Sequence, residues 1–269
     1  MPRFSANLGF LFTEVPEIDR IAAAAAAGFK AVEMHWPYQV PAADMRNALT
    51  RSQVTMLGLN TPVGHAAAGD FGLGALAGRE SEFQQAVDQA VSYGHAIGAT
   101  AVHCMSGIVA PDAVSTAERT FVANLMLAAE KAAQAGMTVL LEPINHRDKP
   151  GYFLHRVEQA ASIIDQVGRR NVKIMFDCYH TQIMQGDLTR RLKDHLDLIG
   201  HVQIAAVPSR AEPDEGEIDC RHIGRFLDSI GYGGWIGAEY KPRGRTEDGL
   251  GWLATWPQDL PSNAYGALA

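Results

Sequence analysis

A short pattern recurs along this chain and limits what it can fold into: a helix-forming stretch, a glycine, a few residues and then an apolar run. Copies of it surround Gly28, Gly136 and Gly231. Strands that alternate with helices favour parallel pairing in βαβ units. We expect helices that end near glycines 28, 98, 136, 168, 200 and 231, over residues 18–27, 80–96, 116–135, 154–166, 188–198 and 220–229. We expect strands near residues 4–8, 31–35, 55–60, 101–104, 138–142, 173–177, 200–204 and 235–239.

About eight such units in 269 residues predict one α/β domain, a single (β/α)8 TIM barrel over residues 1–269. An irregular extension is expected from about residue 253. The rival fold is a doubly wound open sheet, which carries a glycine-rich phosphate turn after its first strand. Residues 10–14 contain no such turn, and the glycine-rich segment 72–78 does not directly follow a strand. We therefore expect no nucleotide cofactor.

Composition excludes several classes of function. A formal net charge of −7, with no basic run longer than a pair, disfavours binding to nucleic acid. No apolar stretch is long enough for a membrane-spanning helix, so no membrane association is expected. The three cysteines are odd in number and widely spaced, which disfavours a disulfide framework or a thiolate zinc site. The chain is therefore expected in a reducing, cytoplasmic compartment.

Four of the predicted strands run into a polar residue where continuous apolar sequence would be typical of a buried parallel strand. These residues are Glu142, Asp177, Gln203 and Glu239, at spacings of 35, 26 and 36 residues, near one βα unit each. In a TIM barrel the carboxyl ends of the strands surround one mouth, where active sites form. We therefore expect the four side chains to converge there.

Three carboxylates and an amide in one mouth would repel each other or be partly protonated without a counter-charge. A divalent cation supplies that charge, and oxygen ligands suit Mg²⁺ or Mn²⁺ rather than Zn²⁺. The alternative interpretation is that each carboxylate caps a helix or pairs with an arginine. Because all four residues stand at successive strand ends, we favour the metal site over this alternative.

Further polar residues stand near the same predicted mouth. Strand 31–35 offers Glu33 and His35, and Asn60 ends the next strand. Candidate substrate-binding residues are His35, Asn60, His180, Arg210 and Lys241; an arginine fork in particular suits a substrate carboxylate. The alternative for each is core packing or a solvated loop.

At these residues the sequence resembles the hydroxypyruvate isomerase family of the xylose isomerase-like barrels. The resemblance rests on a set of segments rather than on one motif. They are residues 3–8, 28–33, 36–38, 60–64, 77–80, 142–145, 176–180, 200–205, 216–218 and 239–244. It implies that Glu142 and Glu239 form the catalytic acid–base pair and that both, with Asp177 and Gln203, bind the metal. It also implies that His180 and Arg210 hold the substrate's oxygens.

The implied reaction interconverts hydroxypyruvate and 2-hydroxy-3-oxopropanoate by enediolate proton transfer between the two glutamates. The segment 207–214 is shared with the similar 2-oxo-tetronate isomerases, so that substrate is an open alternative, as is a longer sugar in a ketose 3-epimerase. His65 and Asp70 depart from the family's usual residues on a loop expected to contact the substrate. A DNA-repair endonuclease on a related barrel, and a barrel without catalysis, are the alternatives from other classes. The apolar Trp252 and Trp256 suggest an interface in a homo-oligomer.

Overall fold

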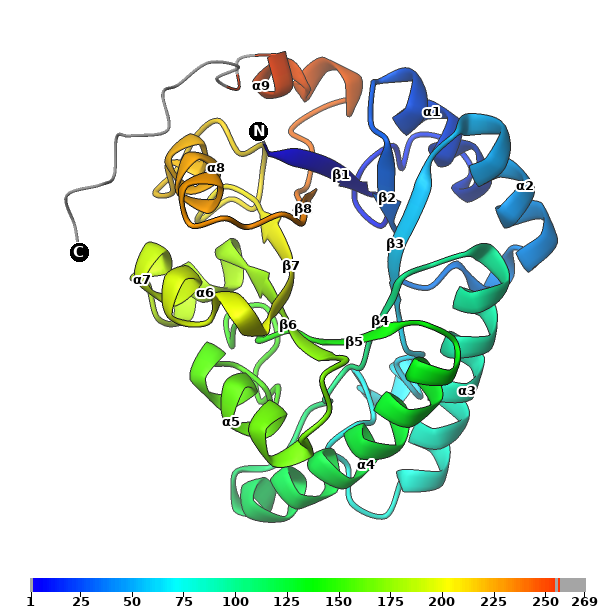
Figure 1. Ribbon diagram of the computed structural model, residues 1–269, viewed down its shortest axis with the longest axis vertical. Coiled ribbons are helices and arrows are strands. Elements are labelled where there is room, and N and C mark those ends of the chain that lie inside the picture. Colours follow the sequence, from blue (N-terminus) through cyan, green and yellow to red (C-terminus); the bar gives the residue numbers. More distant parts are fainter. Residues whose placement is uncertain (1, 255, 257–269) are drawn as a thin grey trace.

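Eight parallel strands close into a barrel in the computed structural model, which describes residues 2–254 and residue 256. The strands follow one another around the ring in chain order, and β1 pairs with β8 to close it (Figure 1). This confirms the predicted (β/α)8 TIM barrel. The strands are β1 (Arg3–Asn7), β2 (Ala31–Glu33), β3 (Thr55–Asn60), β4 (Ala101–His103), β5 (Thr138–Leu141), β6 (Val172–Asp177), β7 (Ile199–Ile204) and β8 (Trp235–Ala238).

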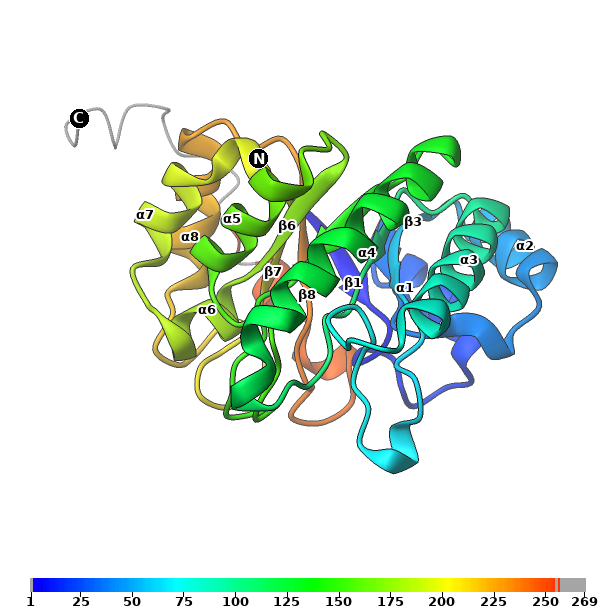
Figure 2. The same cartoon turned by 90° about the horizontal axis from the view of Figure 1, so that it is seen from below.

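Helices lie on the outside of the ring, and neighbours such as α3 and α4 run side by side (Figure 2). Their bounds are α1 (Arg20–Ala26), α2 (Ala42–Ser52), α3 (Glu80–Ile97), α4 (Val114–Gln134), α5 (Val157–Val167), α6 (Cys178–Met184), α7 (Leu188–Asp194), α8 (Cys220–Ser229) and α9 (Gly251–Ala254). Among these residues, no helix combines the length and apolarity needed to cross a membrane.

Several details of the predicted pattern were wrong. Helix α2 was not predicted, because it buries only Met45, Ala48 and Leu49 and is otherwise polar. Gly200 does not end a helix: it lies within β7, where a Cβ atom would stand 2.7 Å from the Cβ of Lys173. Gly98, in contrast, does follow α3 with a left-handed backbone (φ +78°), as a helix-ending glycine should.

The C-terminal segment packs on the outside of the barrel, beside β1 (Figure 1). Trp252 on α9 and the following Trp256 are buried, and their rings pack edge-to-face on Phe4 of β1 at 5.1 and 4.6 Å between centroids. The expectation that these tryptophans form an intermolecular interface was therefore wrong, since they are core residues of this chain. The irregular extension predicted from about residue 253 falls mostly outside the described residues; residues 253 and 254 still belong to α9.

The apolar core lies between the strands and the surrounding helices. Ala101, Leu140 and Met175 form a small separate apolar cluster within the barrel. Buried polar side chains from the strands and their ends lie there too: Ser5, Glu33, His103, Glu142, Asp177, His201, Gln203 and Glu239. The outer layer therefore stabilises the fold, and the interior is left for a polar site.

Candidate active site

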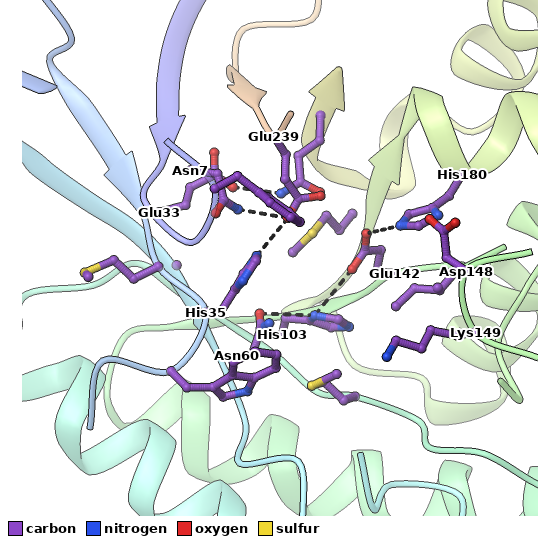
Figure 3. A pocket seen from close by; sticks show the side chains of 18 of the residues that line it. Asn7, Glu33, His35, Asn60, His103, Glu142, Asp148, Lys149, His180 and Glu239 are labelled. Atoms are coloured by element: carbon purple, nitrogen blue, oxygen red, sulfur yellow. Dashed lines mark hydrogen bonds and ion pairs between the residues drawn. The ribbon is translucent and has the colours of Figure 1, made fainter. Parts of the chain in front are cut away.

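A cavity of about 100 Å³ opens at the carboxyl ends of the strands (Figure 3). Polar residues of its lining come from all eight strands or the segments that follow them: Asn7, Glu33, His35, Asn60, His103, Glu142, Asp148, Lys149, His180, Gln203, Arg210 and Glu239. Aromatic rings of Phe10, Trp36 and Phe71 complete its wall. This is the mouth at which TIM-barrel enzymes place their active sites.

Strand pairing brings the four residues predicted at strand ends to the same end of the barrel. Asp177 of β6 and Gln203 of β7 are register partners, and Gln203 is in turn the partner of Gly237 on β8, two residues before Glu239. Glu142 directly follows β5. All four side chains are buried, so they meet in a low-dielectric space where their interactions are strong.

Glu239 is surrounded by donors. One carboxylate oxygen accepts a hydrogen bond from Asn7 Nδ2 at 2.9 Å and lies 3.0 Å from His35 Nε2; the other accepts one from Arg210 Nη2 at 2.7 Å. Burial alone would raise the pKa of this carboxyl, but Arg210 and His35 outweigh burial and lower it to about 2. Glu239 is therefore an ionised carboxylate at neutral pH.

Glu142 has the opposite environment. Burial, and then the charges of Glu239 and Asp177, raise the pKa of Glu142 well above its usual value. Its nearest basic atoms, His103 Nδ1 and His180 Nε2, are each 3.6 Å away, too far for a hydrogen bond. Two carboxyl groups whose surroundings push their pKa values apart are the arrangement expected of an acid and a base.

His180 presents a donor to this site. Its Nδ1 faces two N–H groups of Asn145, the backbone N at 3.3 Å and Nδ2 at 2.6 Å, and so acts as an acceptor. The ring proton then resides on Nε2, which lies 3.6 Å from both Glu142 Oε1 and Asp177 Oδ2. Burial lowers the pKa of His180 well below its usual value, which keeps the ring neutral. The ring can thus donate a hydrogen bond to an oxygen in the cavity.

Arg210 crosses the mouth from the loop after β7. Besides Glu239, its guanidinium lies 3.5 Å from Asp148 and 3.7 Å from Asp177, between the rings of Phe10 and Tyr179. Its backbone is left-handed, with φ +56°, a conformation that persists in a non-glycine residue only where surrounding contacts hold it. The guanidinium is therefore held in place over the carboxylates.

The residues present fit a divalent cation. Ligand atoms of Glu142, Asp177 and His180 lie within 4.8 Å of one another, which brings two carboxylates close enough to share one metal ion, with the His180 ring beside them. Buried Asp177 Oδ2 and Gln203 Oε1 have no hydrogen-bond partner within the described part of the chain. Because the Nε2 of His180 carries the proton, the free donors are oxygens, the atoms that Mg²⁺ and Mn²⁺ prefer.

Of the other predicted substrate-binding residues, two line the cavity and one does not. His35 and Asn60 line the cavity, and Asn60 Oδ1 lies 3.2 Å from His103 Nδ1. Lys241 is exposed and is not part of the cavity lining, so its prediction as a substrate-binding residue is not supported. A different cation, Lys149 on the loop after β5, points into the cavity instead (Figure 3).

Sequence reasoning also missed Asn7 and His103. Each is the last residue of its strand, β1 and β4 respectively. The predicted strands 4–8 and 101–104 run one residue further, to Leu8 and Cys104, so the criterion that selected Glu142 and Asp177 passed over both residues. Lys149 carries no such signal, since its position depends on the path of a loop.

Comparison with known proteins identifies a family with the same barrel fold. The sequence model of the xylose isomerase-like TIM barrel family matches residues 21–256. A 2-oxo-tetronate isomerase from Cupriavidus necator is 47% identical over 254 residues, covering 94% of this chain and 98% of that protein. A hydroxypyruvate isomerase from Escherichia coli is 40% identical over 255 residues, with the same two coverages.

A crystal structure from Brucella melitensis, described as an AP endonuclease of family 2, superposes with a TM-score of 0.92 at 45% identity. It covers 94% of this chain and 98% of its own. The chain therefore belongs to the xylose isomerase-like TIM barrel family, and the two curated relatives compared with it are isomerases.

Proposed function

We propose that the protein interconverts hydroxypyruvate and 2-hydroxy-3-oxopropanoate, with a 2-oxo-tetronate as the alternative substrate. The observation that carries this proposal is the opposite environment of Glu142 and Glu239 in one cavity. The curated relatives support the choice of substrates, since they are named for these two reactions.

The reaction needs a base, an acid and a means of stabilising an enediolate. Ionised Glu239 takes the proton from C3 of hydroxypyruvate, and protonated Glu142 delivers a proton to C2. The hydroxyl proton shifts from the C3 oxygen to the C2 oxygen, so the product is the isomeric aldehyde. The reverse reaction starts from the exchanged protonation states of the two glutamates.

His180 and Arg210 orient the substrate. The Nε2–H of His180 donates to a substrate oxygen, and the guanidinium of Arg210 favours the negative charge that develops on the enediolate. A divalent cation, when bound by Asp177, Gln203 and one oxygen of each glutamate, would supply Lewis-acid stabilisation of the same oxygens.

The cations of the cavity support an acidic substrate. Arg210 already contacts carboxylates, whereas no carboxylate among the described residues forms an ion pair with Lys149. Lys149 Nζ instead lies 3.9 Å from the centre of the Phe71 ring. Both proposed substrates carry a carboxylate that could pair with this lysine, and a neutral ketose does not.

A coupled isomerase assay tests the proposal. Protein stripped with a chelator is given hydroxypyruvate, a 2-oxo-tetronate or a free ketohexose, with and without added Mg²⁺ or Mn²⁺. Metal-dependent turnover of hydroxypyruvate supports the full proposal, and turnover that survives chelation removes the cation from it. Turnover of the tetronate alone selects the alternative substrate, and turnover of the ketose alone rejects an acidic substrate.

A further inference from the structure

The side-chain amide of Gln203 donates a hydrogen bond to the buried carboxylate of Glu33. We propose that Glu33 and His201 are positioning residues that fix this amide with its carbonyl oxygen toward the cavity. This inference rests on the proposed role of Gln203 as an oxygen donor in the site. It concerns how that oxygen comes to face the site.

The contacts divide the two oxygens of Glu33 between different partners. Oε1 accepts a hydrogen bond from Ser5 Oγ at 2.6 Å and lies 3.0 Å from His201 Nε2. Oε2 accepts a hydrogen bond from Gln203 Nε2 at 2.8 Å. All four side chains are buried. Ser5 thus holds one oxygen of the carboxylate by a hydrogen bond, with His201 as its close ion-pair neighbour, and the other oxygen is aimed at the amide.

A carboxylate selects one of the two orientations of an amide. An ionised carboxylate only accepts hydrogen bonds, whereas an amide has a donor end and an acceptor end. With Nε2 on Glu33, Oε1 must point the other way. Oε1 is buried and has no hydrogen-bond partner among residues 2–254 and 256. An unpaired buried acceptor is rare in a folded protein, and an oxygen in this state suits the role of a ligand donor.

The backbone leaves space for this arrangement. His201 and Gln203 are two residues apart on β7 and so share its inward face. On neighbouring β8, a Cβ at Gly237 would stand 2.4 Å from Glu33 Oε1 and 2.9 Å from both His201 Nε2 and Gln203 Cγ. A glycine at this position therefore lets β2 and β7 bring the three side chains together.

Neutron diffraction from deuterated crystals tests the orientation directly, because it distinguishes an ND2 group from an oxygen. It requires neither substrate nor metal. We expect the ND2 group of Gln203 to face Glu33. A carbonyl oxygen in that place would overturn the inference and leave the proposed reaction untouched.

If the Gln203 oxygen binds a cation, its orientation should affect the affinity of the site for Mn²⁺. The dissociation constant is measured from the concentration of free Mn²⁺ by electron paramagnetic resonance. In E33Q the new amide can donate to Gln203 and turn its carbonyl away, so we expect binding at least ~10-fold weaker, as for other supporting residues of metal sites. The double variant E33Q/Q203E restores an oxygen on the cavity side, and its affinity should return to within about threefold of wild type.

E212Q is the matched control, since Glu212 is also a buried carboxylate with a basic partner, Arg243, but lies outside the cavity lining. Its Mn²⁺ affinity should equal that of wild type. An E33Q affinity within threefold of wild type, a double variant no better than E33Q, or an equal loss in E212Q would each overturn the inference. If wild-type protein binds no Mn²⁺, the metal of the proposed function fails, and the neutron result alone decides the orientation.

Discussion

Glu142 and Glu239 show how far the surroundings of a side chain decide its chemistry. Both are buried glutamates that directly follow a strand and share one cavity. Asn7, His35 and Arg210 stabilise the charge on Glu239, whereas burial and neighbouring carboxylates oppose a charge on Glu142. The proposed roles of base and acid therefore rest on these neighbours and not on residue type.

Replacing either glutamate should therefore stop proton transfer without unfolding the protein. We expect E142Q and E239Q each to lower kcat for hydroxypyruvate by ~10²-fold or more, the loss typical of removing a general acid or base. The measurement is turnover at saturating substrate, with circular dichroism as the check on folding. Near wild-type turnover in either variant would reject that residue's assignment.

Substitution of Lys149 tests whether the protein recognises the negative charge of its substrate. We expect K149M to lower kcat/KM for hydroxypyruvate by about tenfold, mainly through KM, because one charge-assisted contact to the carboxylate is lost. K241M is the matched control, since Lys241 is exposed and outside the cavity lining. Equal KM values for K149M and wild type would show that the carboxylate binds elsewhere.

At the scale of elements, strand ends were the most predictable part of the site. A strand buried on both sides must be apolar, so a polar residue where it ends is visible in the sequence. Helix α6 was not visible, because it begins only where the side chain of Asp177 accepts hydrogen bonds from the backbone N–H groups of Tyr179 and His180. The position of Lys149 was not visible either, since loop paths depend on tertiary contacts.

The loops after the first and last strands are joined through Glu14. Its carboxylate accepts hydrogen bonds from the backbone N and the hydroxyl of Thr246, whose Oγ1 accepts one from Phe12 N at 2.7 Å. Burial alone would raise the pKa of Glu14, but the bonds from Thr246 outweigh burial and lower it. A lowered pKa means that this contact stabilises the fold above pH 4.5 and is lost as the pH falls below it.

We accordingly expect E14Q to lower the free energy of unfolding at pH 7 by about 0.5 kcal/mol, a value that allows for solvent screening of an exposed side chain. The difference from wild type should shrink to nothing as the pH falls well below 4.5. Urea unfolding at pH 7 and at pH 3.5 measures both values. A difference that is the same at the two pH values would contradict the assigned role.

At the scale of the whole molecule, stability and chemistry reside in different layers. The apolar core lies outside the strands, and the carboxylates, histidines and amides of the site lie inside them. The formal net charge of −7 would repel a nucleic acid, whereas a small substrate can be held by a few cations within the cavity. Substitutions in the outer layer should therefore lower the free energy of unfolding and have little effect on kcat.

Trp252 tests this separation. It is buried against Phe4, and its Nε1 donates a hydrogen bond to the Tyr240 hydroxyl at 3.1 Å. We expect W252A to lower the free energy of unfolding by ~3 kcal/mol or more, the usual result of removing a buried aromatic ring. At 20 °C, kcat of the folded fraction should stay within about threefold of wild type. A large loss of kcat with unchanged stability would contradict the separation.

The hydrogen bond from Asn7 to Glu239 has a consequence for the making of this protein. The two residues stand 232 positions apart, on the first strand and just after the last one. A chain still on the ribosome cannot form this bond until its final strand has emerged and paired with its first. The proposed base therefore acquires its partner only at the last step of barrel closure, and turnover would report that the ring is complete.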